Sequence, residues 1–167
     1  MAELTNQEKL QPSLLDRLTD DDPEQKQEPR SRRVLSIQRL RESVLRDLAW
    51  LLNTTTLRIT GLQAKYPEVA RSVINYGLPD FAGATGTSVN AEEMEAMVRQ
   101  AIWDFEPRIL RGTLKVRVQS HESQMNHNSL TFQIEGELWA QPVPLELYLK
   151  TELDLETGSI SIADYVR

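Results

Sequence analysis

Two histidines are the side chains best suited to proton transfer near neutral pH, and both lie in one polar stretch. His121 and Glu122 are adjacent, and His127 follows a few residues later. Together they could bind a metal ion, but they supply neither a complete ligand set nor the i, i+4 histidine pair of a helical zinc site. Their place between two alternating segments favours an exposed hairpin loop over residues 120–129. The sequence therefore predicts no metal site.

Paired carboxylates are the remaining catalytic signature. Glycoside hydrolysis needs two facing carboxyl groups, one of which donates a proton. Three acidic residues lie on one predicted helix or at its end, namely Glu93, Asp104 and Glu106. Nothing in their spacing places two of them in one cleft. The sequence also has no cysteine, no nucleophile-elbow serine and no dinucleotide or phosphate-loop fingerprint. We therefore predict no catalytic residue and no cofactor.

Charge and hydropathy exclude further classes. The 167 residues include 19 basic and 25 acidic side chains, a net charge of −6, which is unsuited to non-specific nucleic-acid binding. No apolar run approaches the roughly 20 residues of a membrane helix, and the polar, acidic first residues do not form a signal peptide. The absence of cysteine is typical of a cytosolic protein. We expect no nucleic acid as partner and no membrane insertion.

An amphipathic helix after Asn90 positions the most unusual charged residues. Asn90 is its expected N-cap and Glu93 the partner of a capping box, with Ser88 as a second cap candidate. Pro107 lacks an N–H and restricts the residue before it, so the helix should end near Glu106. Its apolar face recurs at helical spacing through Met94, Met97, Val98, Ala101, Ile102 and Phe105.

Glu106 and Arg108 then stand on a rigid corner on either side of Pro107. The simplest interpretation is a helix stop with two exposed charges, because charges near helix ends are common and contribute little. The alternative is a binding surface. From the residues alone, the helix stop is favoured.

The chain divides into a tail and one domain. Residues 1–33 are polar and proline-containing, typical of a flexible tail. Within them, residues 12–18 form a short candidate anchor with Ser13 as cap and an apolar face of Leu14, Leu15 and Leu18. Such an anchor docks on its own domain or on a partner, and both alternatives remain open. Residues 34–167 are predicted to form a single domain.

Helical periodicity predicts a second long helix over residues 35–52, with Ser36 as a candidate cap. A short strand is expected over residues 56–60 and a short helix beginning at Pro67. After Arg108 the period changes to two, predicting strands from Leu114, Leu130, Leu145 and Ile160. The predicted fold class is α+β, with helices in the N-terminal two thirds packed on one face of a C-terminal antiparallel β-meander.

Five short motifs in this order resemble a known family. They are residues 13–18 (SLLDRL), 43–54 (SVLRDLAWLLNT), 66–69 (YPEV), 75–80 (NYGLPD) and 106–108 (EPR). Each is weak alone, but their order and spacing are specific. The chain resembles the TssE family, the baseplate wedge subunits of bacterial type VI secretion systems and relatives of a small wedge protein of contractile-tailed phages. The resemblance extends from about Pro12 to the C-terminal sheet.

The resemblance implies a structural role in the bacterial cytoplasm, in an assembly near the inner membrane. It implies that Glu106, Pro107 and Arg108 bind the helical core bundle of the wedge subunits TssF and TssG, and through them TssK. This reverses the preference for a plain helix stop. A proline-fixed charged pair loses little entropy on docking, and an arginine fork makes directional bonds.

The same resemblance implies that a sheet edge receives strands of the sheath subunits TssB and TssC, so that sheath assembly starts on the baseplate. Relatives have also carried a lysozyme label. A peptidoglycan-cleaving hydrolase is therefore the competing hypothesis, and it requires a cleft with two facing carboxylates.

Overall fold

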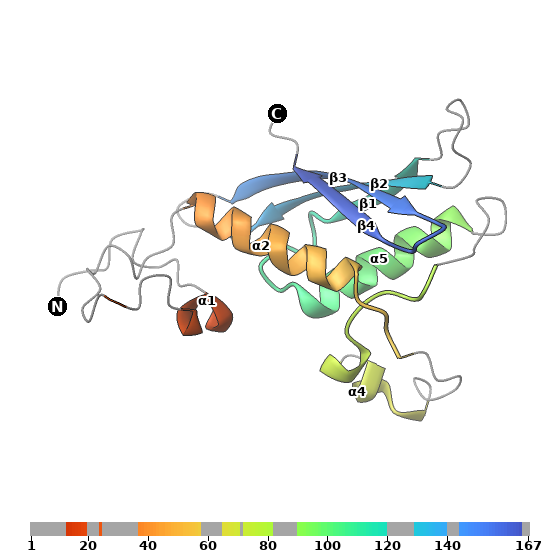
Figure 1. Ribbon diagram of the computed structural model, residues 1–167, viewed down its shortest axis with the longest axis horizontal. Coiled ribbons are helices and arrows are strands. Elements are labelled where there is room, and N and C mark those ends of the chain that lie inside the picture. The colour runs from red at the N-terminus through yellow and green to blue at the C-terminus, as the bar shows by residue number, and fades with distance from the viewer. Residues whose placement is uncertain are drawn as a thin grey trace.

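The computed structural model describes residues 13–19, 24, 37–57, 65–70, 72–81, 90–119, 129–139 and 144–164. Two long helices, α2 (Ile37–Leu52) and α5 (Ala91–Phe105), lie together on one face of an antiparallel sheet (Figure 1). The sheet has the order β1-β2-β3-β4 and is formed by β1 (Lys115–Gln119), β2 (Ser129–Leu138), β3 (Leu145–Asp154) and β4 (Ile160–Asp164). The predicted α+β meander is confirmed.

The core lies between the helices and the sheet. Leu40, Val44, Leu48 and Leu51 recur along one side of α2, and each is at most 4 % exposed. They belong to one core cluster with alternate residues of β2 and β3, because successive side chains of a strand point to opposite faces. Burying one such side chain fully contributes about 1.5–3 kcal/mol. The buried residues of these two strands include Leu130, Phe132, Ile134, Leu138, Leu147, Leu149 and Leu153.

Helix α5 begins and ends where the sequence predicts. The Asn90 side chain accepts a hydrogen bond from the Glu92 N–H at 3.0 Å. In the described part of the chain Glu93 does not bond back to Asn90, so the cap is a single bond and not a reciprocal box. At the other end, the Glu106 N–H still bonds to the Ile102 carbonyl at 2.9 Å, and Pro107 prevents a further turn.

A small parallel bridge connects the end of α2 to the segment that precedes α5. The Leu78 N–H donates to the Thr54 carbonyl, and the Thr56 N–H donates to the Leu78 carbonyl, both at 2.8 Å. Gly77 makes this approach possible. Its φ is +118°, and an added Cβ would lie 2.1 Å from the Thr54 oxygen.

Two shorter helical segments, α4 (Pro67–Ala70) and the 3₁₀ turn η3 (Val73–Asn75), precede that bridge, and α4 begins at Pro67 as predicted. The strand expected over residues 56–60 is only partly within the described residues, and Thr56 and Leu57 are not in a strand. The polar loop with His121, Glu122 and His127, the cap candidates Ser36 and Ser88, and most of residues 1–33 lie outside the described residues.

Each of the two edge strands, β1 and β4, bonds through its backbone to a side chain from another element. At β1, the outward N–H of Val118 donates to the Glu95 carboxylate of α5 at 2.8 Å. At β4, the side-chain amide of Asn53 pairs with both the N–H and the carbonyl of Ile160, each at 2.8 Å. Each edge strand therefore has part of its outer backbone occupied by a side chain from a helix or helix end.

Candidate functional site

The Glu-Pro-Arg corner (Glu106, Pro107, Arg108) is fixed to the end of β2. The Arg108 carbonyl accepts a hydrogen bond from the Trp139 N–H at 2.7 Å, and Ile109 forms an isolated bridge with Leu138. The Ile109 side chain also lies against Gly136, where a Cβ would approach it to 3.2 Å. The corner therefore has the rigidity of the sheet and not of a loop.

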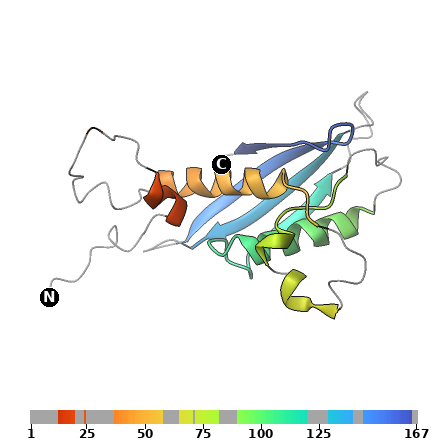
Figure 2. The same ribbon diagram turned by 60° about the horizontal axis from the view of Figure 1, so that its bottom comes forward.

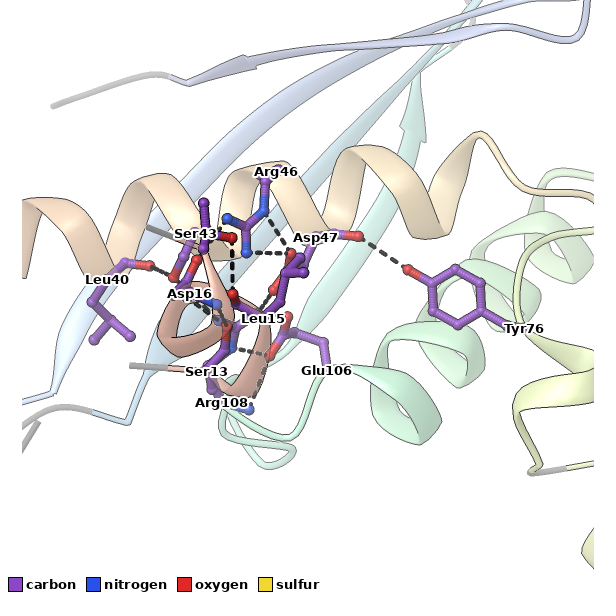
Figure 3. Close-up of polar contacts among 11 residues, drawn as sticks. Ser13, Leu15, Asp16, Leu40, Ser43, Arg46, Asp47, Tyr76, Glu106 and Arg108 are labelled. Atoms are coloured by element: carbon purple, nitrogen blue, oxygen red, sulfur yellow. Dashed lines mark hydrogen bonds and ion pairs between the residues drawn. The ribbon is translucent and has the colours of Figure 1, made fainter. Parts of the chain in front are cut away.

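Arg108 binds inside its own domain (Figure 3). Its Nε and Nη2 donate to the two oxygens of Glu106 at 2.7 and 2.5 Å. Nη2 also donates to Asp47 at 2.5 Å and Nη1 to the Ser43 hydroxyl at 3.2 Å, both on α2. Four of the five side-chain N–H groups of an arginine are thus used within the chain. Arg108 ties the end of α5 to the middle of α2.

Burial makes this pairing necessary. Glu106 is only 4 % exposed, and the Arg108 side chain is 22 % exposed. An ionised carboxylate at that depth is stable only when it is paired. Burial alone would lower the pKa of Arg108, but the hydrogen bond and charge of Glu106, followed by those of Asp47, raise it above its ordinary value. The expectation of two exposed charges is therefore wrong for Glu106, and Pro107 is the exposed member of the corner.

The same ion pairs continue along α2. Asp47 contacts Arg46 at 2.9 Å, and Arg46 contacts Asp16 at 2.6 Å. We call Asp16, Arg46, Asp47, Arg108 and Glu106 the charge network. Carboxylates and guanidinium groups alternate in it, and three carboxylates against two guanidinium groups leave one net negative charge.

The candidate anchor is attached through this network and not through its leucines. It forms α1 (Leu14–Leu18), which lies beside α2 (Figure 2), with Ser13 as its cap. Asp16 joins it to Arg46, whereas Leu14, Leu15 and Leu18 are 70 %, 43 % and 75 % exposed. Burial alone would raise the pKa of Asp16, but hydrogen bonds from Ser13 and Arg46 and the charge of Arg46 outweigh it and lower the pKa below 3.8. The polar side of α1 faces its own domain and its apolar side faces outward.

A pocket of about 360 Å³ opens beside the corner. Tyr76 lines it and donates a hydrogen bond to the Asp47 carbonyl at 3.3 Å (Figure 3). The Tyr76 ring meets Phe105 edge to face, with the ring centroids 5.2 Å apart. Burial, followed by the charges of Asp47 and Glu106, raises the pKa of Tyr76 above 10. The pocket is lined by Ser13, Asp47, Leu51, Tyr76, Phe105, Glu106, Pro107 and Arg108.

Two carboxylates, Asp47 and Glu106, line this one pocket, as a hydrolase would require. Both accept hydrogen bonds from Arg108, however, so both act as acceptors. A glycoside hydrolase needs one of its two carboxyl groups as a proton donor. This arrangement does not provide that acid. Glu93 and Asp104, the other carboxylates considered from the sequence, do not line the pocket.

Ser43, Asp47 and Tyr76 are site residues that the reasoning from periodicity missed. All three lie inside the motifs at 43–54 and 75–80, which was the available signal. Within the described residues, no group of three His, Asp or Glu side chains is placed to hold a metal ion. None of the described helices combines the length and the apolar character needed to cross a bilayer.

The family model for baseplate wedge protein gp25 matches residues 38–143, so this chain belongs to that family of contractile-tail baseplate components. Its role is that of a structural baseplate protein that assembles with other baseplate subunits. Comparisons with curated proteins and with solved structures gave no match.

Proposed function

We propose that this chain is the wedge subunit of a type VI secretion baseplate that joins the wedge core bundle to the contractile sheath and helps to start sheath assembly. The family match and the order of the five motifs support this assignment. The proposed partners are the wedge subunits TssF and TssG, with TssK bound through them, and the sheath subunits TssB and TssC. The proposed setting is the bacterial cytoplasm near the inner membrane.

The observation that carries the proposal is the geometry of the Glu-Pro-Arg corner. Pro107 is exposed, while its two neighbours are held by the charge network and by β2. A surface that is ordered before binding loses little entropy on docking. Among the described residues, four of the five side-chain N–H groups of Arg108 have partners, and we assign the fifth to the wedge contact. In this proposal, Glu106 and Arg108 hold the corner in shape, and Pro107 and the remaining N–H of Arg108 contact the core bundle.

The sheath contact is proposed at β4. On the face of the sheet opposite the helices, β1 carries Lys115 and Arg117, and charged side chains on an edge strand discourage pairing with another strand. The corresponding residues of β4 are the small Ser161 and Ala163. Asn53 bonds to the outward backbone groups of Ile160. No other described residue covers the outer edge of β4 beyond Ile160, so an added strand could pair there.

The exposed leucines of α1 belong to the same proposal. Leu14, Leu15 and Leu18 stand beside the corner because Asp16 attaches α1 to α2. We assign them to a partner and not to the chain's own core, since their apolar side faces away from the domain. The role proposed for the whole chain is non-catalytic.

The test is capture of the purified wedge core bundle by variants of this chain. Pro107→Ala removes an exposed ring and leaves every hydrogen bond of the charge network in place, so its effect reports on contact. Pro67→Ala, at the exposed first position of α4, is the matched control. We expect Pro107→Ala to weaken capture and Pro67→Ala to leave it unchanged. Equal capture by both would exclude the corner as the wedge contact.

For the sheath contact, Ala163→Lys places a charge on the edge strand, and Ala96→Lys places the same charge on the exposed side of α5. We expect only Ala163→Lys to reduce sheath polymerisation on assembled baseplates. Reduction by neither variant would show that β4 is not the edge used.

A further inference from the structure

The pocket beside the corner combines apolar walls with an unbalanced charge. Its lining includes the apolar and aromatic residues Leu51, Tyr76 and Phe105, together with the acidic residues Asp47 and Glu106. Arg108 neutralises only part of that charge, because the whole charge network has one carboxylate more than it has guanidinium groups. Among the described residues, the charge network therefore has one negative charge without a matching cation.

We propose that this pocket receives a basic side chain, arginine or lysine, from the partner that docks on the corner. The inference rests on the proposed function in one respect, that the partner is the wedge core bundle. It adds the chemistry of the group that enters: an aliphatic stem against the aromatic walls, and a cationic head at the carboxylates.

The acceptor capacity of Asp47 supports this occupant. One of its oxygens accepts hydrogen bonds from the Arg46 guanidinium at 2.9–3.0 Å, and the other accepts one from Arg108 at 2.5 Å. A carboxylate has about four lone-pair positions, so a further donor can be accepted beside Arg108. The Asp47 side chain is 23 % exposed and can be reached from the pocket.

The aromatic wall favours a cation over other occupants. The ring of Tyr76 stands edge to face with Phe105, and cations bind well over the faces of such rings. Burial is the largest cause of the raised pKa of Tyr76, and the negative charges of Asp47 and Glu106 raise it further, which agrees with a negative potential here. An acidic side chain would be repelled by that potential, and a purely apolar one would leave the net charge uncompensated. The chain's overall charge of −6 also favours a basic partner surface.

Small probes test the pocket without any other baseplate protein. N-acetyl-arginine amide is titrated into the full chain and followed by NMR at Tyr76 and Phe105. N-acetyl-citrulline amide is the matched control, because it has nearly the same shape and no charge. We expect saturable shifts at both rings and a dissociation constant about fivefold weaker for the citrulline compound, the factor appropriate to one partly exposed ion pair. Added salt should weaken arginine binding and leave citrulline binding unchanged.

Two variants locate the binding. Tyr76→Leu removes an aromatic wall and should weaken the binding of both probes, whereas Glu42→Gln, at an exposed carboxylate of α2 outside the charge network, should leave both affinities unchanged. Equal affinity for the two probes in the wild type, or shifts that do not involve Tyr76 and Phe105, would overturn the inference. The salt dependence in the wild type decides the matter even if Tyr76→Leu does not fold. Capture of the wedge bundle is measured separately, so failure of the pocket inference leaves the proposed function standing and the reverse also holds.

Discussion

Removing the guanidinium of Arg108 should destabilise the fold, and Arg108→Met is the sharpest way to show it. Methionine keeps an apolar stem of similar length and deletes the four side-chain hydrogen bonds to Glu106, Asp47 and Ser43. Losing one partner of a buried ion pair costs about 3–5 kcal/mol. Asp47 is 23 % exposed and regains water, but Glu106 is 4 % exposed and does not. We therefore expect a loss near the lower limit, about 3 kcal/mol.

Tryptophan fluorescence measures this loss, as a free energy of unfolding in urea and as a change in Tm on heating. For a chain of this length, about 3 kcal/mol corresponds to a fall in Tm of roughly 6–12 °C. Arg111→Met is the matched control, because Arg111 is exposed and its guanidinium donates to one backbone carbonyl, that of Trp103. It should cost less than about 1 kcal/mol.

The double variant Glu106→Gln/Arg108→Met should lose less stability than the sum of its two single variants, because it leaves no unpaired buried charge at Glu106. A free energy of unfolding for Arg108→Met equal to that of Arg111→Met would refute the reasoning. So would strict additivity in the double variant. Either result would mean that Glu106 is hydrated in solution and that Arg108 is free to serve a partner.

Three further changes test other parts of the fold. Gly77→Ala should cost about 3 kcal/mol or more, because φ is positive and a Cβ would collide with the Thr54 carbonyl; thermal unfolding measures it, and a wild-type Tm would contradict it. Asn53→Ala should cost about 1–2 kcal/mol and speed amide exchange at Ile160, whose backbone pairs with that amide; unchanged exchange there would exclude the pairing. The folded pKa of Asp16 is lowered below its unfolded value, so its ion pair stabilises α1 above about pH 3.9 and is lost as pH falls through the folded pKa. An NMR titration should show α1 detaching only in that acidic range, and detachment near neutral pH would contradict the assignment.

The periodic elements were predictable because each depends on local residues. The apolar spacing of α5, its Asn90 cap and its stop before Pro107 all follow from short-range rules, and the structure confirms them. The alternating strands follow from the same reasoning. The register and order of the sheet are the simplest consequence of consecutive strands connected as a meander.

The partners of Arg108 were not predictable from local patterns. Asp47 and Ser43 are 61 and 65 residues away in the chain. The helical spacing of apolar residues in α2 predicts that Asp47 is an ordinary surface charge beside the apolar face. Only the crossing of α2 past the end of α5 brings it to Arg108, and that crossing is a property of tertiary packing.

The orientation of α1 also required the structure. Three leucines on one side of a short helix favour docking through that side, yet Asp16 attaches it through the opposite one. The ion pair between Asp16 and Arg46 determines which side of α1 faces the domain, and a periodic pattern of apolar residues does not predict that pair. The sequence left open whether the leucines contact the chain itself or a partner, and their exposure is what favours a partner.

The asymmetry of the two sheet edges determines how many neighbours the chain can have. Helices cover one face of the sheet, and polar and charged side chains such as Lys115, Glu135 and Lys150 alternate on the other, so stacking of a second sheet is unfavourable on both sides. In the sheath contact proposed above, Lys115 and Arg117 on β1 leave extension within the plane to β4. A subunit with one usable edge can begin a row of strands but cannot sit in its middle. If β4 is that edge, this chain is a primer for a polymer and never one of its repeating units, and the number of growing rows equals the number of primers supplied.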